Sequence, residues 1–218
     1  MEHHFDQGLN ELKQRLLTMA SHAESAVNRS VEALVNRNLE LALQVRADDE
    51  ILDRFEVEID ELVINLLAKA PLAGDLRLGM IAMKLSQNLE RIGDEATKIA
   101  KRARDLSKEP PLKLHVEIPR MSALALDLLK TALDAFVNRD AAAARALIPR
   151  DEAVNVIHKQ IQQQIIEHMK ESPENIARCL HFLVAVKSLE RIADHATNIA
   201  EEVVYLCDAA DIRHTDKL

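Results

Sequence analysis

The chain of 218 residues has a formal net charge of −8, few glycines and prolines, and an abundance of Ala, Leu, Glu, Lys, Arg and Gln that is typical of long helices. The acidic balance argues against sequence-independent binding of nucleic acid, and the longest apolar runs are far too short for direct membrane insertion. Since the first residues also lack the basic and apolar regions of a signal peptide, we expect a cytoplasmic protein.

Apolar residues recur at helical spacing along the whole chain and predict six helices. Their expected ranges, in chain order, are 6–37, 38–70, 72–107, 119–138, 140–171 and 173–209. Proline cannot continue a helix, so Pro110 and Pro111 predict a linker over residues 108–118. Pro149 lies inside the fifth expected helix, at the position that matches Ala47, and predicts a kink there.

The chain contains an internal repeat of about one hundred residues. Residues 89–100 (LERIGDEATKIA) and 189–200 (LERIADHATNIA) agree at nine of twelve positions. Residues 33–38 (ALVNRN) also align with residues 135–140 (AFVNRD), at an offset of 102. We therefore predict an all-α fold with two homologous antiparallel three-helix bundles, residues 1–107 and 119–218, that arose by internal duplication.

Pairs of carboxylates lie beside the apolar seams of the first bundle, that is, beside the apolar residues that line one side of each expected helix. Glu90 and Asp94 are four residues apart and share one face of the third expected helix. With the apolar seam turned to the core, this face points outward, unlike the inward ligands of ferritin-like di-iron bundles. Asp49 and Asp53 form the same kind of pair on the second helix. Two neighbouring helices that each present such a pair can form a surface groove of hard oxygen ligands for a cation.

The second bundle repeats this arrangement with one departure. Asp151 on the fifth helix and the pair Glu190 and Asp194 on the sixth helix match the residues of the first bundle. However, Asn155 stands where the repeat places Asp53. A neutral amide oxygen attracts a cation less than a carboxylate does, so we expect the second site to be the weaker one.

Another reading of these carboxylates remains open. Outward Asp and Glu side chains usually form a solvated face, and Arg91, Lys98 and Arg191 could neutralise them by ordinary ion pairs. His195 follows Asp194 and could be a ligand, but its counterpart is Glu95, so we expect it to face solvent. No nucleophilic triad, phosphate-binding glycine loop or dinucleotide-binding motif is present, and we expect no enzymatic activity.

The two LERI[GA]D motifs, together with the segment PLAGDLR at residues 71–77, resemble the PhoU family of phosphate-uptake regulators over essentially the whole chain. The resemblance implies a cytoplasmic homodimer that restrains phosphate uptake and silences starvation signalling. Its implied partners are the ATPase subunit of the phosphate ABC transporter and the phosphate sensor histidine kinase. Some members hold surface metal ions through E(D)xxxD motifs, which here are Asp49/Asp53, Glu90/Asp94 and Glu190/Asp194, with iron, zinc or another divalent cation as candidates.

Two functional classes remain from the sequence. The first is a non-enzymatic regulator that binds its partners through long helical faces. The alternative is a metal-dependent hydrolase or oxidase that uses the carboxylate clusters. Catalytic iron and zinc sites usually include imidazole, and no group of histidines accompanies these pairs, so the regulator is favoured.

Overall fold

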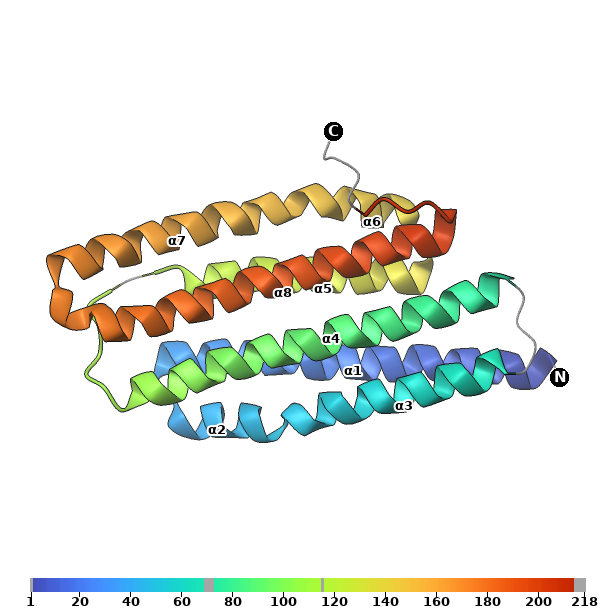
Figure 1. Cartoon of the computed structure of the whole chain (residues 1–218), viewed down its shortest axis with the longest axis horizontal. Helices are drawn as coiled ribbons and strands as arrows, with labels where there is room; N and C mark the ends of the chain where they lie inside the picture. Colours follow the sequence, from blue (N-terminus) through green and yellow to red (C-terminus); the bar gives the residue numbers. More distant parts are fainter. Residues whose placement is uncertain (1, 69–72, 115, 214–218) are drawn as a thin grey trace.

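The computed structural model describes residues 2–68, 73–114 and 116–213, and all of its regular structure within these ranges is helical. The prediction of an all-α fold is therefore confirmed. Within the described ranges, eight α-helices and two short 3₁₀ turns follow one another, and the α-helices can be followed in Figure 1. They are α1 (Glu2–Asn36), α2 (Leu39–Ala47), α3 (Asp49–Leu67), α4 (Ala73–Ser107), α5 (Ile118–Asn138), α6 (Ala141–Leu147), η1 (Ile148–Arg150), α7 (Asp151–Glu171), η2 (Pro173–Asn175) and α8 (Ile176–Asp208).

The helices form two elongated three-helix bundles, if the pairs α2–α3 and α6–α7 are each taken as one broken helix, and the bundles lie side by side (Figure 1). In the first bundle α1 and the pair α2–α3 pack against α4, and in the second α5 and the pair α6–α7 pack against α8. The bundles meet along α4 and α8, with a smaller contact between α1 and α5. As a result, the buried apolar side chains of both halves form one connected core. No helix in the described ranges is both long and apolar enough to cross a membrane.

The predicted apolar seams are buried. On α4 the side chains of Leu85, Leu89 and Ile92 are all 0 % exposed, and on α8 so are Leu189 and Ile192. Each seam faces the other helices of its bundle, because apolar residues that alternate three and four apart line up on one side of a helix. The opposite sides of α4 and α8 therefore carry the charged residues.

The second and fifth expected helices are both broken into two. The predicted kink at Pro149 is confirmed as the 3₁₀ turn between α6 and α7. The first half breaks at the equivalent place without a proline, so the prediction of one continuous helix over residues 38–70 is wrong. There Asp48 is the last residue to join the hydrogen bonds of α2, through its N–H to the carbonyl of Gln44, and its ψ is −6°. Arg29 of α1 pairs with the carboxylate of Asp48 at 2.7 Å. This tertiary contact leaves no mark on the periodicity of the segment. The expected helix boundaries at residues 70 and 72 lie outside the described residues.

The repeated VNR motif forms the same turn in both halves. Arg37 and Arg139 adopt the left-handed conformation, with φ of 55° and 50°. The next residue then caps the following helix, with Asn38 accepting a hydrogen bond from the backbone N–H of Leu41 and Asp140 one from that of Ala143. A short side-chain acceptor at this position satisfies a backbone donor that the helix cannot. The duplicated sequence therefore fixes the duplicated turn.

Gly93 allows α3 and α4 to approach closely. A Cβ atom at this position would lie 2.2 Å from Cδ1 of Leu52 and 3.7 Å from Oδ1 of Asp49. In the second half the repeat places Ala193 and Val154 at the positions of Gly93 and Leu52. In the second half the residue on α8 is larger than Gly93, and the matching residue on α7 is smaller than Leu52, so the total volume at the contact changes little. In the first half the close approach brings the start of α3, with Asp49, against the middle of α4.

Candidate functional site

The carboxylates predicted in the first bundle lie close enough to perturb one another. Asp49 and Asp53 occupy the first two turns of α3, and Glu90 and Asp94 lie in the middle of α4, which packs against α3. Burial raises the pKa of Asp49, and the like charges of Asp53 and Asp94 raise it further against a hydrogen bond from Thr97. The structure therefore brings these four residues into one acidic cluster on the outer surface.

Glu90 is the most perturbed member of this cluster. Burial raises its pKa to about 7, with further contributions from the negative charges of Asp94, Glu56, Asp53 and Asp49. A carboxylate that is half-buried among four others loses hydration and gains repulsion, and both effects favour its protonated form. A group with such a pKa changes its charge near neutral pH, where an ordinary glutamate stays ionised.

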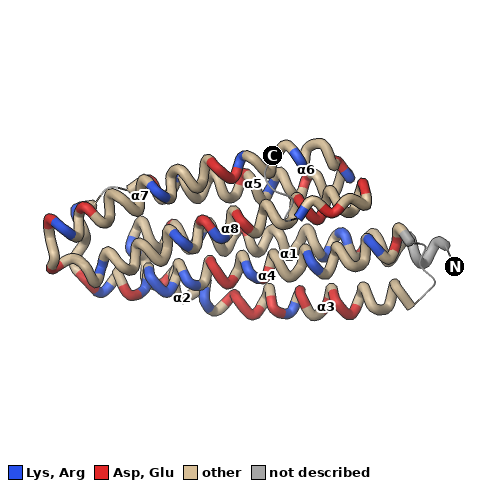
Figure 2. Tube along the Cα trace, turned by 45° about the horizontal axis from the view of Figure 1, so that its top comes forward, with Lys and Arg blue, Asp and Glu red and all other residues tan. Residues whose placement is uncertain are grey.

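Glu56 is a fifth member that the sequence analysis missed. Burial and the charges of Asp60 and Asp53 raise its pKa, while Arg91 of α4 opposes the shift. Its signal was present in the sequence, because Asp49, Asp53, Glu56 and Asp60 follow the spacing four, three, four of one helix face. Acidic residues accordingly recur along α3 in Figure 2. We call Asp49, Asp53, Glu56, Glu90 and Asp94 the α3–α4 cluster.

The corresponding residues of the second bundle have less unbalanced negative charge around them. Asn155 donates a hydrogen bond to Oδ2 of the buried Asp151 at 3.0 Å. Lys187 pairs with Oε2 of Glu190 at 2.5 Å, whereas the repeat places Gln87 at the equivalent position of α4. His158 stands at the position that matches Glu56 in the repeat, and the negative charge of Glu190 acts on its ring.

Asp194 remains exposed on α8. The structure therefore places the predicted residues of the second set on neighbouring helices, but this set lacks the excess negative charge of the first. In the described part of the chain, no group of three His, Cys, Asp or Glu side chains has, as placed, the geometry to hold a metal ion.

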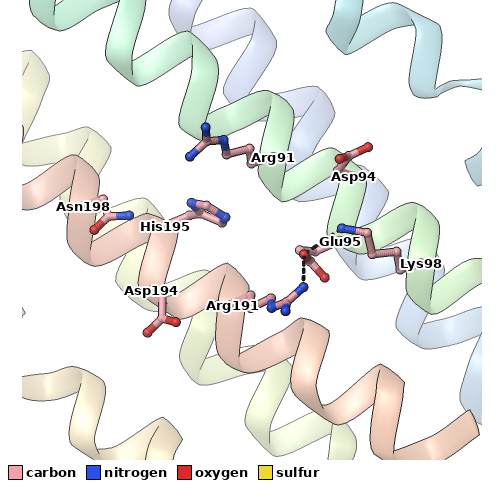
Figure 3. Close-up of a pocket in the computed structure, with 8 residues that line it drawn as sticks. All are labelled: Arg91, Asp94, Glu95, Lys98, Arg191, Asp194, His195 and Asn198. Atoms are coloured by element: carbon pink, nitrogen blue, oxygen red, sulfur yellow. Dashed lines mark hydrogen bonds and ion pairs between the residues drawn. The ribbon is translucent and has the colours of Figure 1, made fainter.

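A groove of about 460 Å³ lies between the two bundles, on the surface where α4 and α8 meet (Figure 3). Its lining comes from positions that are equivalent in the repeat, one from each helix. The four pairs are Arg91 and Arg191, Asp94 and Asp194, Glu95 and His195, and Lys98 and Asn198. We call it the α4–α8 groove.

Glu95 is the buried charge of this groove, with only 4 % of its surface exposed. It forms ion pairs with Lys98 of its own helix at 2.9 Å and with Arg191 of α8 at 3.3 Å. Burial by itself would raise the pKa of Glu95, but hydrogen bonds with Lys98, Ser188 and Arg191 lower it below the usual value. Glu95 therefore links the two bundles as an ionised group.

The prediction that His195 faces solvent is wrong. Its ring lies between α4 and α8, and its Nδ1–H donates a hydrogen bond to Oδ1 of Asn88 at 3.0 Å. Burial lowers the pKa of His195, and the positive charges of Arg91, Lys98 and Arg191 lower it further against the opposite effect of Glu95. Periodicity within one helix did not reveal this environment, because the covering helix belongs to the other half of the chain.

The duplication is also evident from comparison with known proteins. The PhoU domain model matches residues 16–103 and again residues 118–203. The chain belongs to the PhoU family. A phosphate-specific transport system accessory protein PhoU homolog of Pseudomonas putida is 39% identical over 220 residues, which cover 98% of this chain and 86% of the relative. A homolog of the same description from Aquifex aeolicus is 37% identical, with 94% of each chain covered.

Solved structures of PhoU proteins have the same fold. The crystal structure of PhoU from Pseudomonas aeruginosa superposes with a TM-score of 0.90 at 38% identity and covers 94% of this chain and 100% of its own. The phosphate transport system regulatory protein PhoU from Streptococcus pneumoniae gives a TM-score of 0.88 at 28% identity, with 95% and 99% covered. The family likeness therefore extends over both bundles and their packing against each other.

Proposed function

We propose that this protein is an accessory regulator of a phosphate-specific transport system. The observation that carries the proposal is the match over nearly the whole length to proteins described as accessory to such systems. Both PhoU domains are present in this chain, and the two-bundle fold is shared with PhoU proteins. These relatives give no support to the alternative of a metal-dependent hydrolase or oxidase.

The regulator acts by binding rather than by turnover. A protein without a catalytic group shifts a partner between two states only if it binds one state more tightly than the other. The partners proposed here are the ATPase subunit of the phosphate ABC transporter and the phosphate sensor histidine kinase, both approached from the cytoplasm. The net charge of −8 suits docking on basic surfaces, where complementary charge speeds encounter and makes the association sensitive to salt.

A pull-down with each purified partner tests this proposal. The ATPase subunit and the cytoplasmic part of the kinase should each be retained by the immobilised chain, and less so as the salt concentration rises. In cells, deletion of the gene should leave a reporter of phosphate starvation switched on in ample phosphate, and expression of the chain should switch it off. Failure to bind either partner at low salt, together with a silent reporter in the deletion strain, would refute the proposal.

The α3–α4 cluster is proposed to bind a divalent metal ion such as iron or zinc. Its support is the donor set of five carboxylates on two neighbouring helices, where burial and then mutual repulsion raise the pKa of Glu90 to about 7. A bound cation would relieve this repulsion, and carboxylate oxygens are ligands for hard cations. The second set, Asp151, Glu190 and Asp194, should bind more weakly, because Lys187 already neutralises Glu190.

Metal analysis of protein purified without a histidine tag tests the site. The double variant Glu90→Gln with Asp94→Asn should lose the more tightly bound metal while keeping its helical content by circular dichroism. The matched control changes the equivalent residues, Glu190→Gln with Asp194→Asn, and should keep that metal. If the first variant retains the full stoichiometry, the α3–α4 cluster is a solvated face and not a metal site.

A homodimer is also proposed, on the family resemblance alone. Sedimentation of the full chain over a range of concentrations measures the oligomeric state directly. A single species with a mass near the 24.5 kDa of one chain at every concentration would contradict it.

A further inference from the structure

We propose that the α4–α8 groove binds a phosphate group, either as free inorganic phosphate or as part of a phosphorylated small molecule. The inference goes beyond the proposed regulatory role, because it assigns a ligand to a surface between the two bundles. The groove shares Asp94 with the α3–α4 cluster, and its other seven lining residues lie outside that cluster.

The first argument is the direction of the side chains. In Figure 3 the carboxylates of Asp94 and Asp194 point away from the groove, toward opposite sides of the helix pair. Arg91 and His195 instead point toward one another across the space between α4 and α8. Arg191 reaches across to the carboxylate of Glu95. The groove therefore has basic side chains inside it and its acidic pair at the margins.

The second argument is the balance of charge. Three permanent cations, Arg91, Lys98 and Arg191, line the groove, and Glu95 is the carboxylate turned between the helices. Lys98 and Arg191 both pair with Glu95. None of the ion pairs within the described residues involves Arg91. Over all eight lining residues the formal charges balance, because Asp94 and Asp194 offset two of the cations, but those two carboxylates lie at the margins. Arg91 is the guanidinium of the groove that has no ion pair among the described residues.

The third argument is the chemistry of the donors. A guanidinium presents a planar fork of N–H groups that matches two oxygens of a phosphate, and such charge-assisted bonds are stronger than neutral ones. Arg91 and Arg191 stand at equivalent positions of the two motifs, so they approach the groove from its two walls. Because Nδ1–H of His195 donates to Asn88, Nε2 of the neutral ring is a hydrogen-bond acceptor, and it can accept from the P–OH group of a monohydrogen phosphate. Asn198 adds an amide donor on the same helix.

The size of the groove permits such a ligand. About 460 Å³ is far more than the roughly 30 Å³ that one water molecule occupies in the liquid. An anion held between Arg91 and Arg191 would contact both bundles at once. Its binding would therefore favour the packed arrangement of α4 against α8 over any arrangement that separates them.

Isothermal titration calorimetry of the full chain, freed of metal by chelation, tests the proposal with inorganic phosphate as the probe. Saturable binding is expected, and Arg91→Gln should weaken it about tenfold or more, which corresponds to the loss of a charge-assisted hydrogen bond. Arg120→Gln is the matched control, because Arg120 is an exposed arginine of α5 paired with Glu117 outside the groove. It should bind phosphate within about twofold of the unchanged protein.

Parallel titrations with ATP and with sulfate identify the source of the phosphate group. Tighter binding of ATP than of phosphate, lost in Arg91→Gln, would support a phosphorylated molecule, and preference for inorganic phosphate would support the free ion. Binding of sulfate as tight as that of phosphate would overturn the assignment, since the groove would then hold any oxyanion. No saturable heat up to 10 mM phosphate, or full affinity in Arg91→Gln, would overturn it as well. None of these outcomes depends on the transporter or the kinase.

Discussion

The ionisation of Glu90 should make the metal-free protein less stable as the pH rises toward 7. Its pKa in the folded state is about 7, raised first by burial and then by the charges of Asp94, Glu56, Asp53 and Asp49, against 4.5 for an unperturbed glutamate. The folded state therefore binds more protons than the unfolded state between these two values. Glu90 therefore does not lower the free energy of unfolding below about pH 4.5, and it lowers this free energy progressively as the pH rises to about 7. The full shift would correspond to about 3 kcal/mol, and solvent screening of this partly exposed group reduces it to about 1–2 kcal/mol.

Urea unfolding with a chelator present, at pH 5 and at pH 8, measures this effect. Glu90→Gln removes the charge, so it should stabilise the protein at pH 8 by about 1–2 kcal/mol and have little effect at pH 5. The control is Glu190→Gln, where Lys187 already pairs with the carboxylate and no gain at pH 8 is expected. Added metal should stabilise the unchanged protein but not Glu90→Gln. If Glu90→Gln and Glu190→Gln behave alike at both pH values, the α3–α4 cluster carries no excess repulsion.

Three further predictions concern packing, capping and the second site. Gly93→Ala should lower the free energy of unfolding, measured in urea, by about 1–2 kcal/mol, because overpacking against Leu52 outweighs the better helix propensity of alanine. Adding Leu52→Val should recover part of this loss of stability. Asn38→Ala and Asp140→Ala should each lower the free energy of unfolding by about 0.5–2 kcal/mol in the same measurement, because each removes the cap of one helix. A variant as stable as the unchanged protein would contradict the role of the cap in the shared turn. Lys187→Gln should strengthen metal binding in the second bundle, measured as an added equivalent by metal analysis, and unchanged stoichiometry would show that the lysine does not limit that site.

Much of the candidate site could be predicted from residue spacing. Two residues four apart share a helix face, so the pairs Asp49/Asp53 and Glu90/Asp94 could be placed on outer faces once the apolar seams were identified. The same rule would have found Glu56, three residues after Asp53, had the whole stripe on α3 been followed. Spacing could not show how strongly these residues interact. That depends on the close approach of α3 and α4, which is a property of packing between helices.

The sequence by itself determined the helical class, the duplication, the apolar faces and the turns at Arg37 and Arg139, because each of these follows from local periodicity or from a few adjacent residues. Only the tertiary structure decided that α4 lies against α8. That contact buries Glu95 and draws His195 away from solvent, although both occupy positions that look exposed on an isolated helix. It also decided the break at Asp48, which an arginine of α1 holds in place. Periodicity reports which face of a helix is apolar, whereas the partner of each charged face depends on helices that are distant in the chain.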